Sequence, residues 1–325
     1  MKILITGAAG YIGSVLTKQL LSRDYTVIGL DSLMFGGESL LTFFNHPNFT
    51  FVHDDIRNGE VIRNVLKEVD SVVHLAAIVG DPACAKQPDL AREINWDASK
   101  LLFDLSAENK NIERFVFAST CSNYGKMNGQ AFVTETSPLN PVSLYAELKV
   151  RFEKYILDKK NNTNNYFVPT ALRFATVYGL SPRMRFDLTL NEFIRDVTIG
   201  RELQIFGEQF WRPYSHVEDL ALSVVNVLEA SPEKVAHNVF GVGDTRENYQ
   251  KKMLAEEILK IVPDATINYV RKDEDPRDYR VDFSKINNEL GYLITRRVPD
   301  GIREIHDAIK YKIISDPYNR RYRNI

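Results

Sequence analysis

The stretch Thr6-Gly7-Ala8-Ala9-Gly10-Tyr11-Ile12-Gly13 decides the fold of this chain. It follows the apolar run Lys2–Thr6, which predicts a strand, and precedes Ser14–Ser22, where apolar residues recur at helical spacing. Glycines at these positions permit a tight turn, bring backbone N–H groups close to a pyrophosphate, and let the helix pack closely on the strand. The helix N-terminus favours the same anion. The stretch therefore predicts a dinucleotide-binding unit at the start of the chain.

Short apolar runs continue to alternate with amphipathic segments as far as residue 180. This alternation predicts a parallel sheet with helices on both faces, the doubly wound α/β class of Rossmann type. The predicted strands are Lys2–Thr6, Thr26–Asp31, Phe49–Asp54, Ser71–Ala76, Arg114–Ser119 and Val168–Phe174.

The regular alternation of predicted strands and helices ends after Gly179, and a smaller mixed α/β lobe is expected from there on. We expect the NAD-binding domain to occupy residues 1–178, with returning segments at about 211–243, and the substrate lobe to occupy residues 179–210 and 244–325. In this second part we expect a helix near Asp187–Gly200 and strands near Glu202–Phe206, Val235–Val242 and Thr266–Val270.

The composition excludes some classes of ligand and indicates a cellular compartment. The 41 Lys and Arg residues nearly balance the 43 Asp and Glu residues, so no broad positive field is available for nucleic acid or a membrane surface. The two cysteines, Cys84 and Cys121, form neither a disulfide framework nor a zinc motif, and the histidines lack metal-ligand spacing. No signal peptide or membrane span is visible. We therefore expect a cytoplasmic protein without a metal, whose anions are bound locally.

An acidic residue, Asp31, ends the second predicted strand and sharpens the choice of cofactor. A carboxylate there can accept hydrogen bonds from both ribose hydroxyls and would repel a 2′-phosphate. No Arg or Lys follows in Ser32–Gly37, so the sequence favours NAD over NADP. The alternative is an Asp that only caps the next turn.

A candidate catalytic pair lies at Tyr145 and Lys149, four residues apart and hence on one face of a helix that begins near Ser143. The strand that precedes it ends in hydroxyl side chains, Thr120 among them, at the sheet edge where ligands bind. A lysine ammonium favours the phenolate, so Tyr145 would act as base while Thr120 hydrogen-bonds the substrate oxygen. A second Tyr-x-x-x-Lys copy at Tyr155 runs into a polar loop, and we reject it.

The chain resembles the extended short-chain dehydrogenases/reductases, specifically the NAD-dependent epimerase/dehydratase group acting on nucleotide sugars. The matching pieces are Thr6–Gly13, Asp31, Asp55-Ile56-Arg57, His74-Leu75-Ala76-Ala77, Asn95, Ser119–Gly125, Tyr145 with Lys149, and Leu172–Gly179. The resemblance implies an enzyme with the catalytic trio Thr120, Tyr145 and Lys149. It also implies that NAD contacts Gly7, Gly10, Tyr11, Ile12, Gly13, Asp31, Asp55, Ile56, Leu75, Ala76, Ala77, Tyr145 and Lys149.

Departures from the family pattern narrow the reaction. The 4,6-dehydratases of this family carry an Asp-Glu pair after the catalytic Thr, whereas this chain has Cys121 and Ser122 there, which disfavours dehydration. Cys121 is also offset by one position from the cysteine base of related epimerase/reductases, and we assign it a packing role. The expected reaction is oxidation of a sugar hydroxyl at C4, by a 4-epimerase or a 4-dehydrogenase.

Other readings remain open at this point. The stretches Ala77–Cys84 and Leu172–Asn191 are similar to a branch of the family that includes GDP-heptose 4-dehydrogenases of capsule assembly. The chain also resembles the UDP-glucose 4-epimerases of the family. A 4,6-dehydratase or a 4-keto-sugar reductase is a weaker alternative. A catalytically silent NAD sensor on the same fold is an alternative of another class.

The sugar diphosphate needs cations, and arginine matches its geometry best. The family pattern implicates Arg212 and Arg277; Arg183 and Arg185 are further candidates, and Asn191 is an expected contact. Thr120, Ser122 and Thr176 are expected to line the sugar site, although relatives often carry an Asn at the position of Thr176. The resemblance also implies a homodimer that pairs the helices near Asp89–Asn109 and Ser143–Asp158. Trp96 lies in the first of these helices, and we expect it to be partly buried there or to contact the other subunit.

Overall fold

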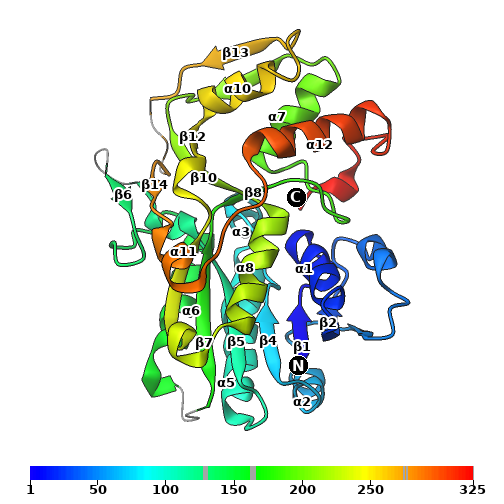
Figure 1. Cartoon of the computed structure of the whole chain (residues 1–325), viewed down its shortest axis with the longest axis vertical. Helices are drawn as coiled ribbons and strands as arrows, with labels where there is room; N and C mark the ends of the chain where they lie inside the picture. The colour runs from blue at the N-terminus through cyan, green and yellow to red at the C-terminus, as the bar shows by residue number, and fades with distance from the viewer. Residues whose placement is uncertain (127–130, 162–165, 274, 276, 325) are drawn as a thin grey trace.

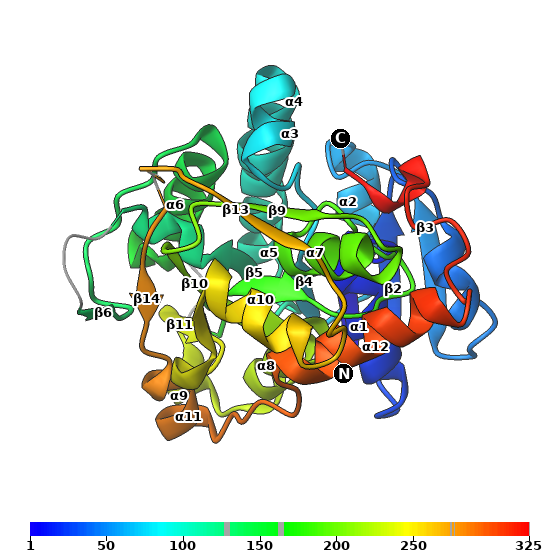
Figure 2. The same cartoon turned by 90° about the horizontal axis from the view of Figure 1, so that it is seen from above.

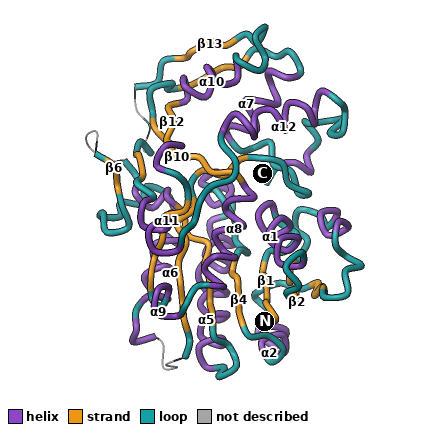
Figure 3. Tube along the Cα trace, viewed as in Figure 1, coloured by secondary structure: helices purple, strands orange, loops and turns teal. Residues whose placement is uncertain are grey.

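The computed structural model describes residues 1–126, 131–161, 166–273, 275 and 277–324. Its centre is a parallel sheet of seven strands in the order β3-β2-β1-β4-β5-β7-β11 (Figures 1 and 3). The strands are β1 (Lys2–Thr6), β2 (Thr26–Asp31), β3 (Phe49–His53), β4 (Ser71–His74), β5 (Arg114–Thr120), β7 (Val168–Phe174) and β11 (Asn238–Val242). Six of the seven lie where the sequence predicts a strand before residue 180, and β11 returns from beyond residue 211 to complete the sheet.

Helices cover both faces of this sheet and create two separate cores. Helices α1 (Tyr11–Leu21) and α8 (Val217–Glu229) pack together on one face, and α2 (Gly59–Leu66), α5 (Ser99–Glu108) and α6 (Leu144–Leu157) cover the other. In β1, Ile3 and Ile5 belong to the first core and Leu4 to the second, because successive side chains of a strand point to opposite faces. The apolar runs in the sequence are uninterrupted because both faces are buried.

The helix expected over Asp89–Asn109 is present but irregular. It consists of α4 (Pro88–Arg92), a π-helical turn (Glu93–Ala98) and α5, in one continuous run. Figure 2 shows α4 and the preceding α3 (Asp81–Lys86) projecting from the body of the molecule. Trp96 packs within this chain, with the Arg151 guanidinium 3.5 Å from its ring centre.

The remaining residues build a second set of elements beyond the carboxyl ends of the strands (Figure 1). Three small sheets pair β8 (Thr176–Tyr178), β10 (Trp211–His216) and β12 (Asn248–Gln250); β9 (Leu203–Phe206) and β13 (Ile267–Val270); and β6 (Phe132–Val133) and β14 (Arg280–Val281). Helices α7 (Thr189–Thr198), α10 (Lys251–Leu259) and α12 (Val298–Lys310) belong to this set, whereas α9 (Pro232–Val235) and α11 (Ser284–Leu290) pack beside the main sheet, α9 against β7 and β11 and α11 against β11. Within the described residues, no helix is long and apolar enough to cross a membrane.

The order of the sheet determines where a ligand can bind. The chain winds outward from β1 through β2 to β3 and then restarts on the other side of β1 with β4. The helices that follow these two branches diverge, which leaves a crevice at the carboxyl ends of β1 and β4. The glycine turn and the end of β5 both lie at this edge.

Candidate active site

A cavity of about 500 Å³ opens at the carboxyl ends of the strands. All the predicted catalytic and cofactor-binding residues line it: Gly7, Gly10, Tyr11, Ile12, Gly13, Asp31, Asp55, Ile56, Leu75, Ala76, Ala77, Thr120, Tyr145 and Lys149. Of the predicted substrate residues, Ser122, Thr176, Arg183, Arg212 and Arg277 line it too. Asn191 does not.

At Gly7 and Gly13, the turn has no room for a Cβ atom. Gly7 has φ of +78°, and a Cβ there would lie 2.9 Å from the backbone nitrogen of Ala76. A Cβ on Gly13 would lie 2.0 Å from the carbonyl oxygen of Gly7. Gly10 caps α1 without a side chain, so the first turn of the helix faces the cavity with its backbone N–H groups. These features fit the pyrophosphate of a dinucleotide such as NAD.

Asp31 has two structural partners at the adenosine end of the cavity. Its Oδ2 accepts a hydrogen bond from the backbone N–H of Ala9 at 3.0 Å, and its Oδ1 accepts one from Leu33 at 2.8 Å. Burial raises the pKa of Asp31, and these hydrogen bonds and the charge of Arg183 oppose the rise. The carboxylate thus holds the glycine turn in place as well as lining the cavity.

We expect Asp31→Ala to weaken NAD binding by about 10- to 100-fold, the effect of losing a hydrogen bond to a charged group. Calorimetry with NAD and with NADP would check this. Loss of NAD affinity alone, with NADP unchanged or improved, is the expected result, because the carboxylate repels the 2′-phosphate. An equal loss for both would mean that the turn has collapsed, and unchanged NAD affinity would refute the assignment of Asp31 to the ribose.

Asn191 connects α7 to α1 and to the loop after Gly179, and it does not face the cavity. Its side chain is completely buried in α7, where Oδ1 accepts from the backbone N–H of Gly179 at 3.1 Å. Its Nδ2 donates to the hydroxyl of Tyr11 at 3.1 Å and to the carbonyl oxygen of Arg185 at 2.9 Å. The expected sugar contact is therefore absent, because the amide is already engaged in fixing the loop after Gly179 against α1.

Tyr145 and Lys149 project from α6 into the cavity. The helix begins after Ser143, whose hydroxyl oxygen accepts from the Ala146 N–H and donates to Asp81. The Lys149 ammonium lies 5.9 Å from the centre of the Tyr145 ring and donates to the Ala118 carbonyl oxygen at 2.8 Å. Burial raises the pKa of Tyr145 and lowers the pKa of Lys149 to about 8.

The end of β5 presents Thr120 to the same cavity. Its Oγ1 accepts a hydrogen bond from the Ser122 N–H at 3.1 Å, an arrangement that leaves the hydroxyl hydrogen available to a ligand. Cys121 points the other way: it is buried, it donates to the carbonyl oxygen of Arg173 at 3.2 Å, and burial raises its pKa. The predicted packing role of Cys121 is confirmed.

Three of the predicted arginines separate into two groups; the fourth, Arg185, also lines the cavity and pairs with Asp187 at 2.8 Å. Arg183 lies at the Asp31 end, stacked on Phe35 with its guanidinium carbon 4.9 Å from the ring centre, and burial lowers its pKa to about 10. Arg212 and Arg277 instead flank Asp275, which accepts from the Arg212 guanidinium at 2.8 Å and from the Arg277 backbone N–H at 2.9 Å. Arg183 thus lies beside Phe35 and within electrostatic reach of Asp31, and its role at the substrate stays a prediction.

Several cavity residues were missed from the sequence. Lys251 begins α10 beside the Arg212 group, and burial lowers its pKa. Tyr214, Tyr279, Asp81 and Asn324 also line the cavity. None carries a local motif, so only the tertiary fold reveals them. In contrast, Tyr155, the rejected second copy, donates to Asp104 on α5, and it is not among the cavity residues.

Comparison with known proteins agrees with this geometry. The model of the NAD dependent epimerase/dehydratase family matches residues 3–243. An uncharacterized UDP-glucose epimerase of Bacillus subtilis is 31% identical over 93% of this chain and 96% of its own length. The structure of UDP-glucuronic acid 4-epimerase from Bacillus cereus, in complex with UDP-glucuronic acid and NAD, superposes with a TM-score of 0.84 at 28% identity, covering 96% of this chain and 99% of that one. DesIV, a dTDP-glucose 4,6-dehydratase of Streptomyces venezuelae, gives a TM-score of 0.83 at 26% identity over 99% of both chains. The chain belongs to the NAD-dependent epimerase/dehydratase family of nucleotide-sugar enzymes.

Proposed function

We propose that this protein oxidises the C4 hydroxyl of a nucleoside-diphosphate sugar, as a 4-epimerase. One observation carries the proposal: Tyr145, Lys149 and Thr120 line the same cavity as the glycine turn and Asp31, with cationic residues at another part of its wall. The relatives with 4-epimerase names support the choice of reaction. A 4-dehydrogenase shares the oxidation step and is distinguished by its product.

The protein's own groups divide the work of proton transfer. Bound NAD supplies the hydride acceptor, and the glycine turn with α1 and Asp31 would hold it. Tyr145 takes the hydroxyl proton of the sugar as its C4–H bond breaks, and Thr120 donates a hydrogen bond to the same oxygen. Burial raises the pKa of Tyr145, and the charge of Arg185 opposes that rise. A positive charge on Lys149 would favour the phenolate in the same sense. A 4-epimerase then reverses these transfers on the opposite face of the sugar.

The residues after Thr120 support oxidation without elimination. A 4,6-dehydration needs an acid and a base at the neighbouring sugar carbons. Here Cys121 is buried and turned away from the cavity, and Ser122 carries no charge. The side chains beside Thr120 therefore favour a keto intermediate that keeps its other hydroxyls.

The Arg212 and Arg277 cluster is the proposed diphosphate site. Arg277 forms an ion pair with Asp81 at 3.0 Å, and Lys251 adds a third cation. Asp275 neutralises part of this charge, and its pKa lies below the usual range because Arg212 and Arg277 outweigh the effect of burial. Three cations, Arg212, Arg277 and Lys251, against the two carboxylates Asp81 and Asp275 leave one net positive charge for a diphosphate.

We expect Arg277→Ala to raise the KM for the nucleotide sugar by about 10- to 100-fold with kcat changed by less than about threefold, because the contact is the same in ground and transition states. The matched control is Arg271→Ala, since the Arg271 side chain is 87% exposed and pairs with Asp273 at 2.7 Å, outside the cavity. UDP should raise the melting temperature of the control and fail to raise that of Arg277→Ala. Equal stabilisation of both would place the diphosphate elsewhere.

The experiment that tests the function offers NAD and a panel of UDP-, GDP-, dTDP- and CDP-sugars to the purified protein. NADH absorbance and product NMR are recorded together. Interconversion of C4 epimers without net NADH identifies an epimerase, and stoichiometric NADH with a keto sugar identifies a dehydrogenase. NAD binding without turnover of any sugar would contradict the proposal and favour a silent sensor.

We propose further that the protein is a cytoplasmic homodimer. Support for the compartment comes from two free, buried cysteines, Cys84 and Cys121, which require no oxidising environment. Support for the dimer comes from α5 and α6, which lie together on one side of the molecule and keep partly exposed apolar residues such as Leu101 and Leu105. Light scattering of the purified protein would test it, and a monomeric mass would exclude the dimer.

A further inference from the structure

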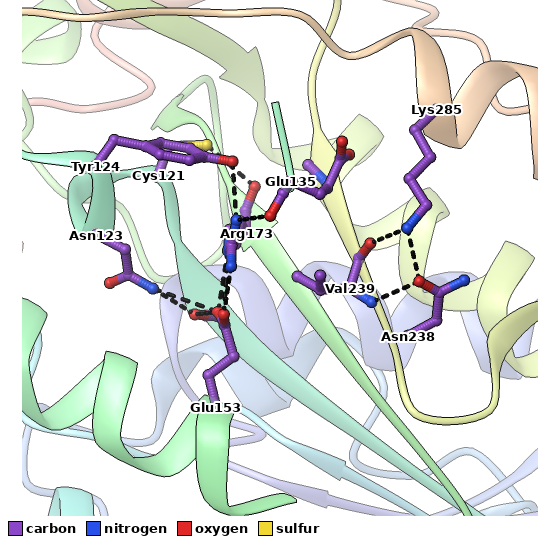
Figure 4. Close-up of polar contacts among 11 residues, drawn as sticks. Cys121, Asn123, Tyr124, Glu135, Glu153, Arg173, Asn238, Val239 and Lys285 are labelled. Carbon is purple, nitrogen blue, oxygen red and sulfur yellow. Dashed lines mark hydrogen bonds and ion pairs between the residues drawn. The ribbon is translucent and has the colours of Figure 1, made fainter. Parts of the chain in front are cut away.

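A charged pair lies buried behind the active site, between Glu153 of α6 and Arg173 of β7 (Figure 4). Their side chains are 2% and 5% exposed, and Nη2 of Arg173 lies 2.6 Å from Oε1 of Glu153. Nε of Arg173 donates to both carboxylate oxygens at 3.2 Å. Neither residue lines the cavity. Burying such a pair adds little stability, because the cost of desolvation offsets the attraction, so the pair points to a role other than stability.

The hydrogen bonds of the pair converge on the end of the catalytic strand. Glu153 Oε2 accepts from the Ser119 hydroxyl at 2.6 Å and from the Asn123 amide at 3.3 Å. Arg173 donates to the Tyr124 hydroxyl and to the Glu135 carbonyl oxygen, each at 3.0 Å. Figure 4 shows the guanidinium between these groups and the carboxylate of Glu153. The pair thus contacts residues on both sides of Thr120 in the sequence.

The same helix contacts the same strand one turn earlier. Lys149, which precedes Glu153 by four residues, donates to the carbonyl oxygen of Ala118, and Glu153 accepts from the next residue, Ser119. Two successive residues of β5 are therefore bound by two successive turns of α6. A rotation or slide of α6 must break both contacts, and Arg173 prevents the carboxylate of Glu153 from following the helix.

We infer that Glu153 and Arg173 are positioning residues, which set the separation between Tyr145 on α6 and Thr120 at the end of β5. The inference rests on the proposed roles of Tyr145 and Thr120. Neither member of the pair lines the cavity, so the pair is expected to act on the geometry of proton and hydride transfer and not on ligand affinity. A displacement of about 1 Å at reacting atoms can lower a rate by about 100-fold.

The test uses Arg173→Lys, which keeps the charge but loses the two-pronged contact, and the double variant Glu153→Leu/Arg173→Met, which leaves no buried charge unpaired. Single-turnover experiments give two readouts. The amplitude measures the fraction of folded, NAD-loaded protein. The rate constant depends on how well Tyr145 and Thr120 are positioned relative to each other. NAD affinity and melting temperature are measured alongside. The control is Glu147→Leu, because Glu147 is exposed on the same helix.

We expect a rate constant lower by about 5-fold in Arg173→Lys and by about 10- to 100-fold in the double variant, with NAD affinity and KM within about twofold of wild type. The control should keep the wild-type rate. Reduced amplitudes with a wild-type rate constant in both variants would overturn the inference and leave a purely structural pair. If the double variant does not fold, Arg173→Lys alone decides. Absence of turnover in the wild type would instead refute the proposed function, on which the inference rests.

Discussion

Tyr145→Phe should lower turnover by at least about 1,000-fold, within the range attributed to a general acid-base group, while NAD binding remains. The substitution removes only the hydroxyl oxygen, so the ring can keep its place on α6 and the cavity keeps its shape. The measurement pairs kcat for the best nucleotide sugar with the affinity for NAD. Tyr11, Tyr214 and Tyr279 also line the cavity, but none of them lies on α6 one turn before Lys149.

The chain offers a matched control for this variant in Tyr155, which occupies the second Tyr-x-x-x-Lys copy on the same helix. Tyr155 donates to Asp104 and is not a cavity residue, so Tyr155→Phe should leave kcat within about twofold of wild type and cost only the net worth of one hydrogen bond in stability. If Tyr145→Phe retains full activity, the assignment of the base is wrong. If both variants are equally impaired, the motif by itself does not identify the base.

Lys149→Met should lower kcat by about 100-fold and move the acid limb of the pH–rate profile to higher pH. The shift follows from electrostatics: removal of a neighbouring positive charge raises the pKa of the Tyr145 phenol, so a higher pH is needed to form the phenolate. The profile of kcat/KM against pH, recorded for wild type and variant, measures the shift. A limb at unchanged pH would show that Lys149 does not assist ionisation.

The pH dependence of the free energy of unfolding gives a second measure of the charge on Lys149, which does not depend on catalysis. Burial lowers the pKa of Lys149 to about 8, below its value in an unfolded chain, so the unfolded state binds more protons above about pH 8. The free energy of unfolding of the ligand-free wild type, relative to that of Lys149→Met, should therefore rise between about pH 8 and about pH 10. Lys154→Met, an exposed lysine on α6, is the control and should behave as wild type in both measurements.

Much of the fold was predictable because local sequence and tertiary structure agree. Three strands, β1, β2 and β7, have the predicted bounds, since a parallel strand buried on both faces is a continuous apolar run ended by turn residues. The glycine turn was predictable because its steric requirement is absolute: no side chain fits at Gly13. Tyr145 and Lys149 were found because the helix spacing fixes their common face.

The unpredicted features depend on contacts between distant segments. The position of Arg183 after Gly179 predicts a substrate contact, but it does not reveal that the side chain stacks on Phe35, a residue distant in the sequence. Asn191 has the polarity of a ligand contact, but a buried junction with Tyr11 and Gly179 uses its amide. The pairing of Glu153 with Arg173 joins a helix to a strand, and neither residue belongs to a spacing motif that names its partner. The π-helical turn before α5 likewise interrupts a segment whose apolar spacing predicts a regular helix.

The central claim is that hydride leaves C4 of a nucleotide sugar with Tyr145 as the base, and a single-turnover experiment with deuterium at C4 tests it most directly. With the best substrate of the panel, reduced cofactor should form transiently, more slowly for the deuterated sugar. The deuterium should be on the nicotinamide in samples quenched during this phase and back at C4 of the sugar when the reaction is complete. Tyr145→Phe should show no such phase although NAD stays bound. NADH formation at the same rate for both sugars, with no deuterium on the cofactor, would contradict the account.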